Sequence, residues 1–139
     1  MKKIDSLYIV DDDPITVFGI RKMLKPVVDC DDIQVFENGK TAIEAIKTRN
    51  GQGRPVPNII FLDINMPIMD GWDFLEEFGM LEFKEKAIIN IITSSIDPSD
   101  YQRWSDLKSI FPHHLNFKNK PICKIDDSDL ELKNVSQER

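Results

Sequence analysis

Short apolar runs alternate along the chain with longer amphipathic segments. Four runs stand out, at residues 7–10, 33–36, 58–63 and 87–92, and a weaker one lies at 115–117. The second run alternates more than the others, which are nearly continuous. Continuous runs of this length are typical of strands buried on both faces, as in a parallel sheet.

The segments between these runs have recognisable helix starts. Each of four starts joins a capping side chain to a proline or a glycine: Asp13-Pro14, Asn38-Gly39, Asp70-Gly71 and Asp97-Pro98. The polar segment Ser128–Arg139 is predicted to form a last helix with a frayed end. The order βα, repeated five times, predicts an α/β fold with a doubly wound sheet and helices on both faces.

Composition narrows the classes of function. The 139 residues suit one domain, and no apolar run approaches the roughly 18 residues that span a bilayer. The net charge of −6 disfavours direct binding to nucleic acid, which needs clustered Lys and Arg. Cys30 and Cys123 have neither disulfide-framework nor metal-ligand spacing, so both are expected to be reduced thiols. We therefore expect a cytoplasmic domain without membrane insertion.

The candidate chemistry lies where the predicted strands end. The first strand ends in Asp11-Asp12-Asp13, the third in Asp63 and the fourth in Thr93, and Lys120 follows the fifth. In open α/β sheets, ligands bind outside the carboxyl ends of the strands. Carboxylates held close together repel each other unless a cation is present, and Mg²⁺ prefers oxygen ligands. An aspartate can act as a phosphoryl nucleophile, and a lysine can hold a phosphate oxygen.

These residues stand in four segments that together resemble the receiver domain of bacterial two-component response regulators. The segments are 10–14, 62–71, 92–95 and Lys120-Pro121, and the resemblance covers roughly residues 5–125. It implies a flavodoxin-like (βα)5 fold with strand order 2-1-3-4-5. It also implies one receiver domain over residues 1–139, with a core at about 5–125 and a last helix and frayed tail at 126–139.

The resemblance also implies a role for individual residues. Asp63 matches the phosphorylation site, Asp11 and Asp12 match the acidic pair that binds Mg²⁺, and Asn65 matches the position whose backbone carbonyl binds the metal. Thr93 and Lys120 match the residues that contact the phosphoryl group. Phe117 lies where the family carries a switch aromatic, without the hydroxyl of the commoner tyrosine.

The function implied is that of a phosphoacceptor and not of an enzyme, beyond slow hydrolysis of its own phosphoaspartate. The implied donor is a phosphohistidine on a sensor histidine kinase or a histidine phosphotransfer protein, and a downstream protein would read the changed surface. The chain is expected to be a monomer or a homodimer through its fourth and fifth helices. Two alternatives are a pseudo-receiver that only binds partners and a Mg²⁺-dependent hydrolase. Asn65 stands where such hydrolases need a second acid.

Other conspicuous side chains have structural explanations. Asp13 is expected to cap a helix because Pro14 follows it. His113 and His114 are expected to be exposed in a loop. Trp72 and Trp104 are expected to half-cover the core from their helices. The acidic residues 126, 127 and 129 are interpreted as favourable charges at a helix start and not as a second metal site.

Overall fold

The computed structural model describes residues 1–131. A five-stranded, wholly parallel sheet lies at its centre, in the order β4-β2-β5-β6-β7. The strands span Leu7–Val10 (β2), Ile33–Phe36 (β4), Ile59–Asp63 (β5), Ile88–Thr93 (β6) and His114–Asn119 (β7). These are the five predicted strands, taken in chain order, so the observed sheet has the predicted order 2-1-3-4-5.

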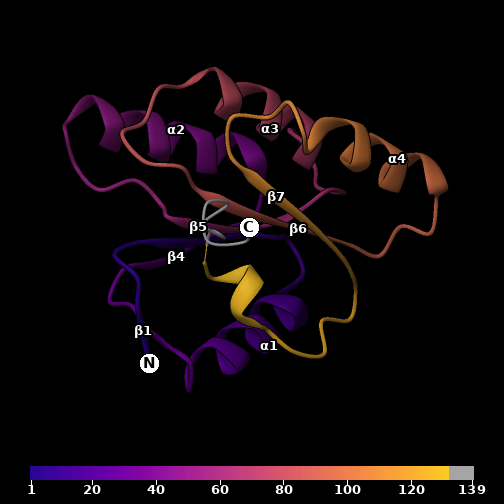
Figure 1. Ribbon diagram of the computed structural model, residues 1–139, viewed down its shortest axis with the longest axis horizontal. Helices are drawn as coiled ribbons and strands as arrows, with labels where there is room; N and C mark the ends of the chain where they lie inside the picture. The colour runs from indigo at the N-terminus through magenta and orange to yellow at the C-terminus, as the bar shows by residue number, and fades with distance from the viewer. Residues whose placement is uncertain (132–139) are drawn as a thin grey trace, which may run out of the picture.

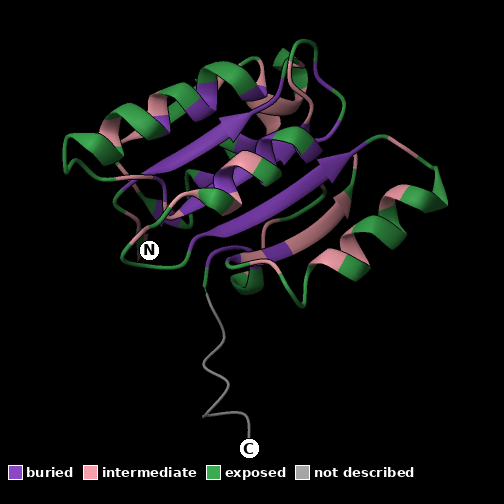
Figure 2. Ribbon diagram, turned by 90° about the horizontal axis from the view of Figure 1, so that it is seen from above, coloured by how far each residue is buried: buried purple, intermediate pink, exposed green. Residues whose placement is uncertain are grey.

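The three central strands are buried along their whole length, as their continuous apolar runs predict. The edge strand β4 has no buried residue and β7 has one, in keeping with their more polar sequences. Figure 2 shows this gradient from the buried strands to the half-buried β7. The sheet therefore has one apolar centre and two more polar edges.

Within residues 1–131, four helices pack on the two faces, at Pro14–Leu24 (α1), Gly39–Gly51 (α2), Gly71–Met80 (α3) and Pro98–Leu107 (α4). Their predicted caps are all present: Asp13, Asn38, Asp70 and Asp97 each accept a backbone N–H of the first turn. Helices α2, α3 and α4 lie on one face of the sheet, and α1 lies on the other with the segment after β7 (Figure 1). The doubly wound fold is thereby confirmed.

The sheet separates two apolar cores. The larger core joins the sheet to α2 and α3, with Phe74 and Phe78 fully buried in it. The smaller core joins the other face to α1 through Ile20 and Leu24 and to the C-terminal segment through Leu130. None of the helices within residues 1–131 is both long enough and apolar enough to cross a membrane.

Three features differ from the predictions. A short parallel pair, β1 (Lys2–Lys3) with β3 (Val28–Asp29), was not predicted, because two-residue strands leave no periodic signal. Where the last helix was expected, the chain forms a 3₁₀ turn, η1 (Asp127–Asp129), and leaves helical geometry by Glu131. The rest of the predicted helix, residues 132–139, lies outside the described part of the chain.

Candidate functional site

Three strand ends bring a lysine and two carboxylates together. Asp11 follows β2, Asp63 ends β5, and Lys120 follows β7. The ammonium nitrogen of Lys120 lies 3.1 Å from Oδ2 of Asp11 and 3.5 Å from Oδ2 of Asp63. The cation therefore faces both carboxylates at the carboxyl edge of the sheet, where ligands bind in folds of this type.

Both carboxylates are buried and close enough to repel each other. Burial raises the pKa of Asp63 to about 6, and the charge of Asp11 adds to this rise while that of Lys120 opposes it. Burial likewise raises the pKa of Asp11. Burial disfavours the Lys120 ammonium, but its contact with Asp11 and the charge of that carboxylate outweigh burial, so the pKa of Lys120 is raised. Because Lys120 carries a single positive charge, the site keeps an excess of negative charge when both carboxylates are ionised.

The donor set fits a hard divalent cation. Asp11, Asp12 and Asp63 each offer a carboxylate oxygen, and the three oxygens lie within 4.8 Å of one another. Asp12 is exposed, whereas Asp11 and Asp63 are buried. Oδ2 of Asp11 is buried and accepts no hydrogen bond, although it lies within ion-pair distance of Lys120. A buried carboxylate oxygen that faces one ammonium, beside two further carboxylate oxygens, is an arrangement that Mg²⁺ would complete.

The loop after β5 is held tightly against the site. The backbone N–H of Asn65 donates to Oδ1 of Asp63 at 3.2 Å, and the N–H of Gly71 donates to the carbonyl of Ile64. A Cβ on Gly71 would lie 2.6 Å from the carbonyl oxygen of Asp63, so only glycine lets α3 start this close to the strand. Ile68 in the same loop has a φ of 70°, which is strained for a β-branched residue.

Thr93 lies at the end of β6, beside the end of β5. Ile92 is the register partner of Asp63, so Thr93 stands one residue beyond it. Its side chain is buried, and Oγ1 accepts the N–H of Ser95 at 3.0 Å. The N–H of Lys120 donates to the carbonyl of Thr93 at 2.8 Å, so the loops that follow β6 and β7 are joined at the site.

Phe117 points away from this polar edge, toward α4. Its ring centroid lies 5.7 Å from the centroids of both Tyr101 and Trp104, and the indole N–H of Trp104 donates to the carbonyl of Leu115. Phe117 is half-buried under these two rings. The aromatic cluster of Tyr101, Trp104 and Phe117 therefore anchors α4 to β7.

Two of the structural interpretations need correction. His113 is buried and not exposed: its Nδ1 accepts the N–H of Ala87 at 2.9 Å, and its ring packs on Phe78. His114 is half-buried, with Nε2 3.1 Å from the Oδ1 of Asn116. Pro112, which precedes the two histidines, indicated an exposed loop. The chain instead turns inward here, and β7 begins at His114.

The second correction concerns Asp129, which was interpreted as a favourable charge at a helix start. It is buried with 1% exposure, accepts the N–H of Asp126 and pairs with Lys118 at 3.1 Å, so it is not a surface charge at a helix start. Its backbone carbonyl accepts from the buried Asn90 of β6. The only signal in the sequence is an asparagine within an apolar run, which predicts a buried polar partner without saying which residue it is.

Comparisons with known proteins place these features in a family. The family described as the response regulator receiver domain matches residues 7–108. A crystal structure of a two-component response regulator from Cytophaga hutchinsonii is similar with a TM-score of 0.69 and 30% identity, over 87% of this chain and 89% of that one.

Curated relatives agree with this match. The chemotaxis protein CheY of Listeria monocytogenes is 32% identical over 84 residues, which are 60% of this chain and 65% of CheY. The transcriptional regulatory protein BtsR of Salmonella typhimurium is 30% identical over 117 residues, which are 84% of this chain and 42% of BtsR. The chain thus spans less than two thirds of either relative. Because the family match covers well over half of the chain, the chain belongs to the family of response regulator receiver domains of two-component systems.

Proposed function

We propose that this receiver domain accepts a phosphoryl group on Asp63 with the help of Mg²⁺. The observation that carries the proposal is the position of the Asp63 carboxylate, which faces Lys120 and stands beside two further aspartates. Asp11, Asp12 and Asp63 would hold the metal, together with the backbone carbonyl of Asn65. Mg²⁺, when bound, would neutralise charge that develops on the transferring group.

The reaction needs little from the protein beyond position and charge. An oxygen of the Asp63 carboxylate bonds to phosphorus as the P–N bond of the donor phosphohistidine breaks, and the imidazole leaves with that bonding pair. Lys120 holds a positive charge beside the oxygen of Asp63 that it already faces, so it can bind an incoming phosphoryl oxygen. No side chain must move a proton to activate the nucleophile, because a carboxylate is already ionised near neutral pH.

The phosphoryl group would then act as a switch. It adds about −1.5 to −2 charge and three acceptor oxygens, which the hydroxyl of Thr93 and the ammonium of Lys120 can bind. Its hydroxyl can donate to a phosphoryl oxygen while Oγ1 still accepts the N–H of Ser95, so movement of Thr93 toward the phosphoryl group would draw the loop leading into α4 with it. Phe117 lies under α4 and would repack with it. Thr93→Ala should therefore leave phosphorylation intact while abolishing the change in NMR shifts around α4 and β7.

The partner that supplies the phosphoryl group is proposed to dock on α1. A cleft of about 320 Å³ opens beside Asp11 and Asp12 and is lined by Pro14, Val17 and Phe18. Phe18 is 67% exposed, and Ile15, one helical turn before it, is 80% exposed. A sensor histidine kinase or a histidine phosphotransfer protein could cover this apolar strip while its histidine reaches Asp63.

The wider role follows from the same chemistry. We propose that this receiver domain acts in the cytoplasm as a signalling switch, and that a further protein reads its phosphorylation state by contact. Hydrolysis would then be limited to its own phosphoaspartate. A hydrolase that turns over free phosphate esters is disfavoured by Asn65, an amide where such an enzyme needs a second acid.

Intact-protein mass spectrometry tests the central proposal. The protein is incubated with acetyl phosphate, with Mg²⁺ or with EDTA, and wild type is compared with Asp63→Asn. One adduct of about 80 Da that requires both Mg²⁺ and Asp63 is expected. A time course from seconds onward guards against rapid self-hydrolysis. An adduct of unchanged size in Asp63→Asn, or no adduct at any time, would refute the assignment of Asp63 as acceptor.

A further inference from the structure

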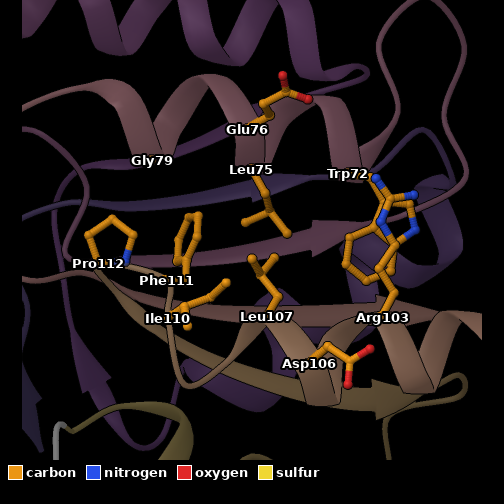
Figure 3. Close-up of a pocket in the computed structure, with 10 residues that line it drawn as sticks. All are labelled: Trp72, Leu75, Glu76, Gly79, Arg103, Asp106, Leu107, Ile110, Phe111 and Pro112. Carbon is orange, nitrogen blue, oxygen red and sulfur yellow. The ribbon is translucent and has the colours of Figure 1, made fainter.

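The helices α3 and α4 leave an apolar groove between them that the phosphoryl chemistry does not use. Its volume is about 490 Å³. Its apolar lining comes from both helices and from the loop that follows α4: Leu75, Leu107, Ile110, Phe111 and Pro112. In Figure 3, Leu75 and Leu107 point toward each other across the groove, and Phe111 and Pro112 line one end of it.

Helix α4 is unusually poorly covered for an amphipathic helix. None of its residues is buried, although it carries Tyr101, Trp104 and Leu107. The anchors described above hold only the side of α4 that faces β7. On the α3 side the apolar surface continues past the helix end to Ile110, which is 78% exposed. An apolar helix side of this kind is expected to be completed by a further element.

The groove is shaped by features that fix its two ends. At one end Arg103 stacks on Trp72, with its guanidinium carbon 4.7 Å from the ring centroid, and the indole N–H of Trp72 donates to Asp100. At the other end Gly79 lets Phe111 approach, since a Cβ there would lie 2.9 Å from the Phe111 ring. One end is thus lined by polar groups stacked on Trp72, and the other is apolar.

Charge on the rims indicates what the groove would accept. Glu76 of α3 and Asp106 of α4 stand on opposite rims, both exposed (Figure 3). Neither carboxylate has an ion-pair partner within residues 1–131. Arg103 is the one cation that lines the groove among the described residues, and it is engaged with Trp72. A partner that inserts apolar side chains into the groove would therefore bind more favourably if Lys or Arg residues flank those side chains.

We propose that this groove binds a basic amphipathic helix of a partner protein. The helix would lie across α3 and α4, insert leucine-like side chains between Leu75 and Leu107, and place lysines or arginines near Glu76 and Asp106. Helix-in-groove recognition of this kind uses apolar anchors spaced at i, i+3, i+4 and i+7. The groove is present in the unphosphorylated protein, so this proposal stands independently of the acceptor role of Asp63.

A pair of synthetic peptides tests the proposal. One is an alanine-based helix of about 14 residues with leucines at i, i+3, i+4 and i+7 and lysines on its flanks; the other has glutamate in place of every lysine. The chain has two tryptophans, and their indole N–H signals in a ¹⁵N–¹H spectrum report separately. Trp72 lines the groove, whereas the indole N–H of Trp104 is bonded to Leu115. The basic peptide should shift the Trp72 signal more than the Trp104 signal, and the acidic peptide should shift neither.

Charge reversal provides the matched variants. Glu76→Lys/Asp106→Lys should weaken binding of the basic peptide at least about tenfold, since each rim charge changes from attractive to repulsive. Glu44→Lys/Asp31→Lys makes the same change in net charge at exposed sites away from the groove and should leave the affinity unchanged.

Three results would overturn the proposal. The first is equal binding of the two peptides, and the second is an equal loss of affinity in both charge-reversed variants. The third is a shift of Trp72 that grows with protein concentration in the absence of peptide, which would make a second copy of the chain the occupant.

Discussion

Replacing Asp63 by asparagine is predicted to stabilise the metal-free protein. Asp63 is 3% exposed and lies beside the buried Asp11, and Lys120 is the cation that faces both. The pKa of Asp63 is raised from 3.8 to about 6, so ionisation of this group opposes folding. Asparagine keeps the oxygen that accepts the Asn65 N–H and removes the buried charge.

The size of the effect follows from that rise in pKa. A rise from 3.8 to about 6 corresponds to roughly 3 kcal/mol of lost stability once the carboxyl is ionised in both states. The amide of asparagine would face Lys120, so we expect a net gain of about 2 kcal/mol. Because the folded pKa lies above the unfolded one, the penalty is absent below about pH 4 and grows as the pH rises toward about 6.

Urea denaturation followed by circular dichroism measures this gain. Wild type, Asp63→Asn and the exposed control Asp31→Asn are compared in EDTA at about pH 7.5 and about pH 4. The gain should be present at the higher pH and largely absent at the lower one, and the control should change by less than about 0.5 kcal/mol. Added Mg²⁺ should stabilise wild type much more than Asp63→Asn, which has lost one of the proposed ligands.

Either of two results would contradict this prediction. One is an Asp63→Asn protein that is no more stable than wild type at the higher pH in EDTA. The other is an equal gain at both pH values, because a gain without pH dependence cannot come from removing a titrating charge.

Three further predictions concern residues around the site and the core. Gly71→Ala should lower stability by about 1–3 kcal/mol and slow phosphorylation of Asp63, since its Cβ would collide with backbone; urea denaturation and adduct mass measure the two effects. Lys118→Met should lower the free energy of unfolding by about 2 kcal/mol, because it leaves the Asp129 carboxylate without its ion-pair partner. Lys118→Arg should keep the ion pair and most of the wild-type stability. Burial lowers the pKa of His113, so wild type should lose stability as the pH falls from about 7 to 5, and His113→Gln should flatten that dependence in thermal melts.

The fold was predictable because its signals are local. Unbroken apolar runs marked the three buried strands, and a capping residue marked the start of α1, α2, α3 and α4. The candidate site followed from these elements, since strands that run parallel must bring their carboxyl ends to one edge. Asp11, Asp63 and Lys120 meet there as the pattern of strand ends predicts.

What the sequence could not supply were the partners of side chains far apart along the chain. His113 looked like an exposed loop residue, yet it satisfies the N–H of Ala87 inside the core. The acidic residue Asp129 looked like a surface charge, yet it is buried and pairs with Lys118 of β7. Such outcomes depend on which groups meet across the fold, and residue type alone favours the commoner exposed state.

The sequence by itself thus determined the order of the elements, their layering and the edge at which the acidic residues and the lysine gather. These properties depend on hydrophobic periodicity, helix-capping residues and the direction of the strands, all of which can be read from the local sequence. Only the tertiary structure decided the burial of Asp129, the turn that replaces the start of the last helix, and the groove between α3 and α4. Each of these arises from the fit of side chains on separate elements, and that fit is fixed only when the elements pack.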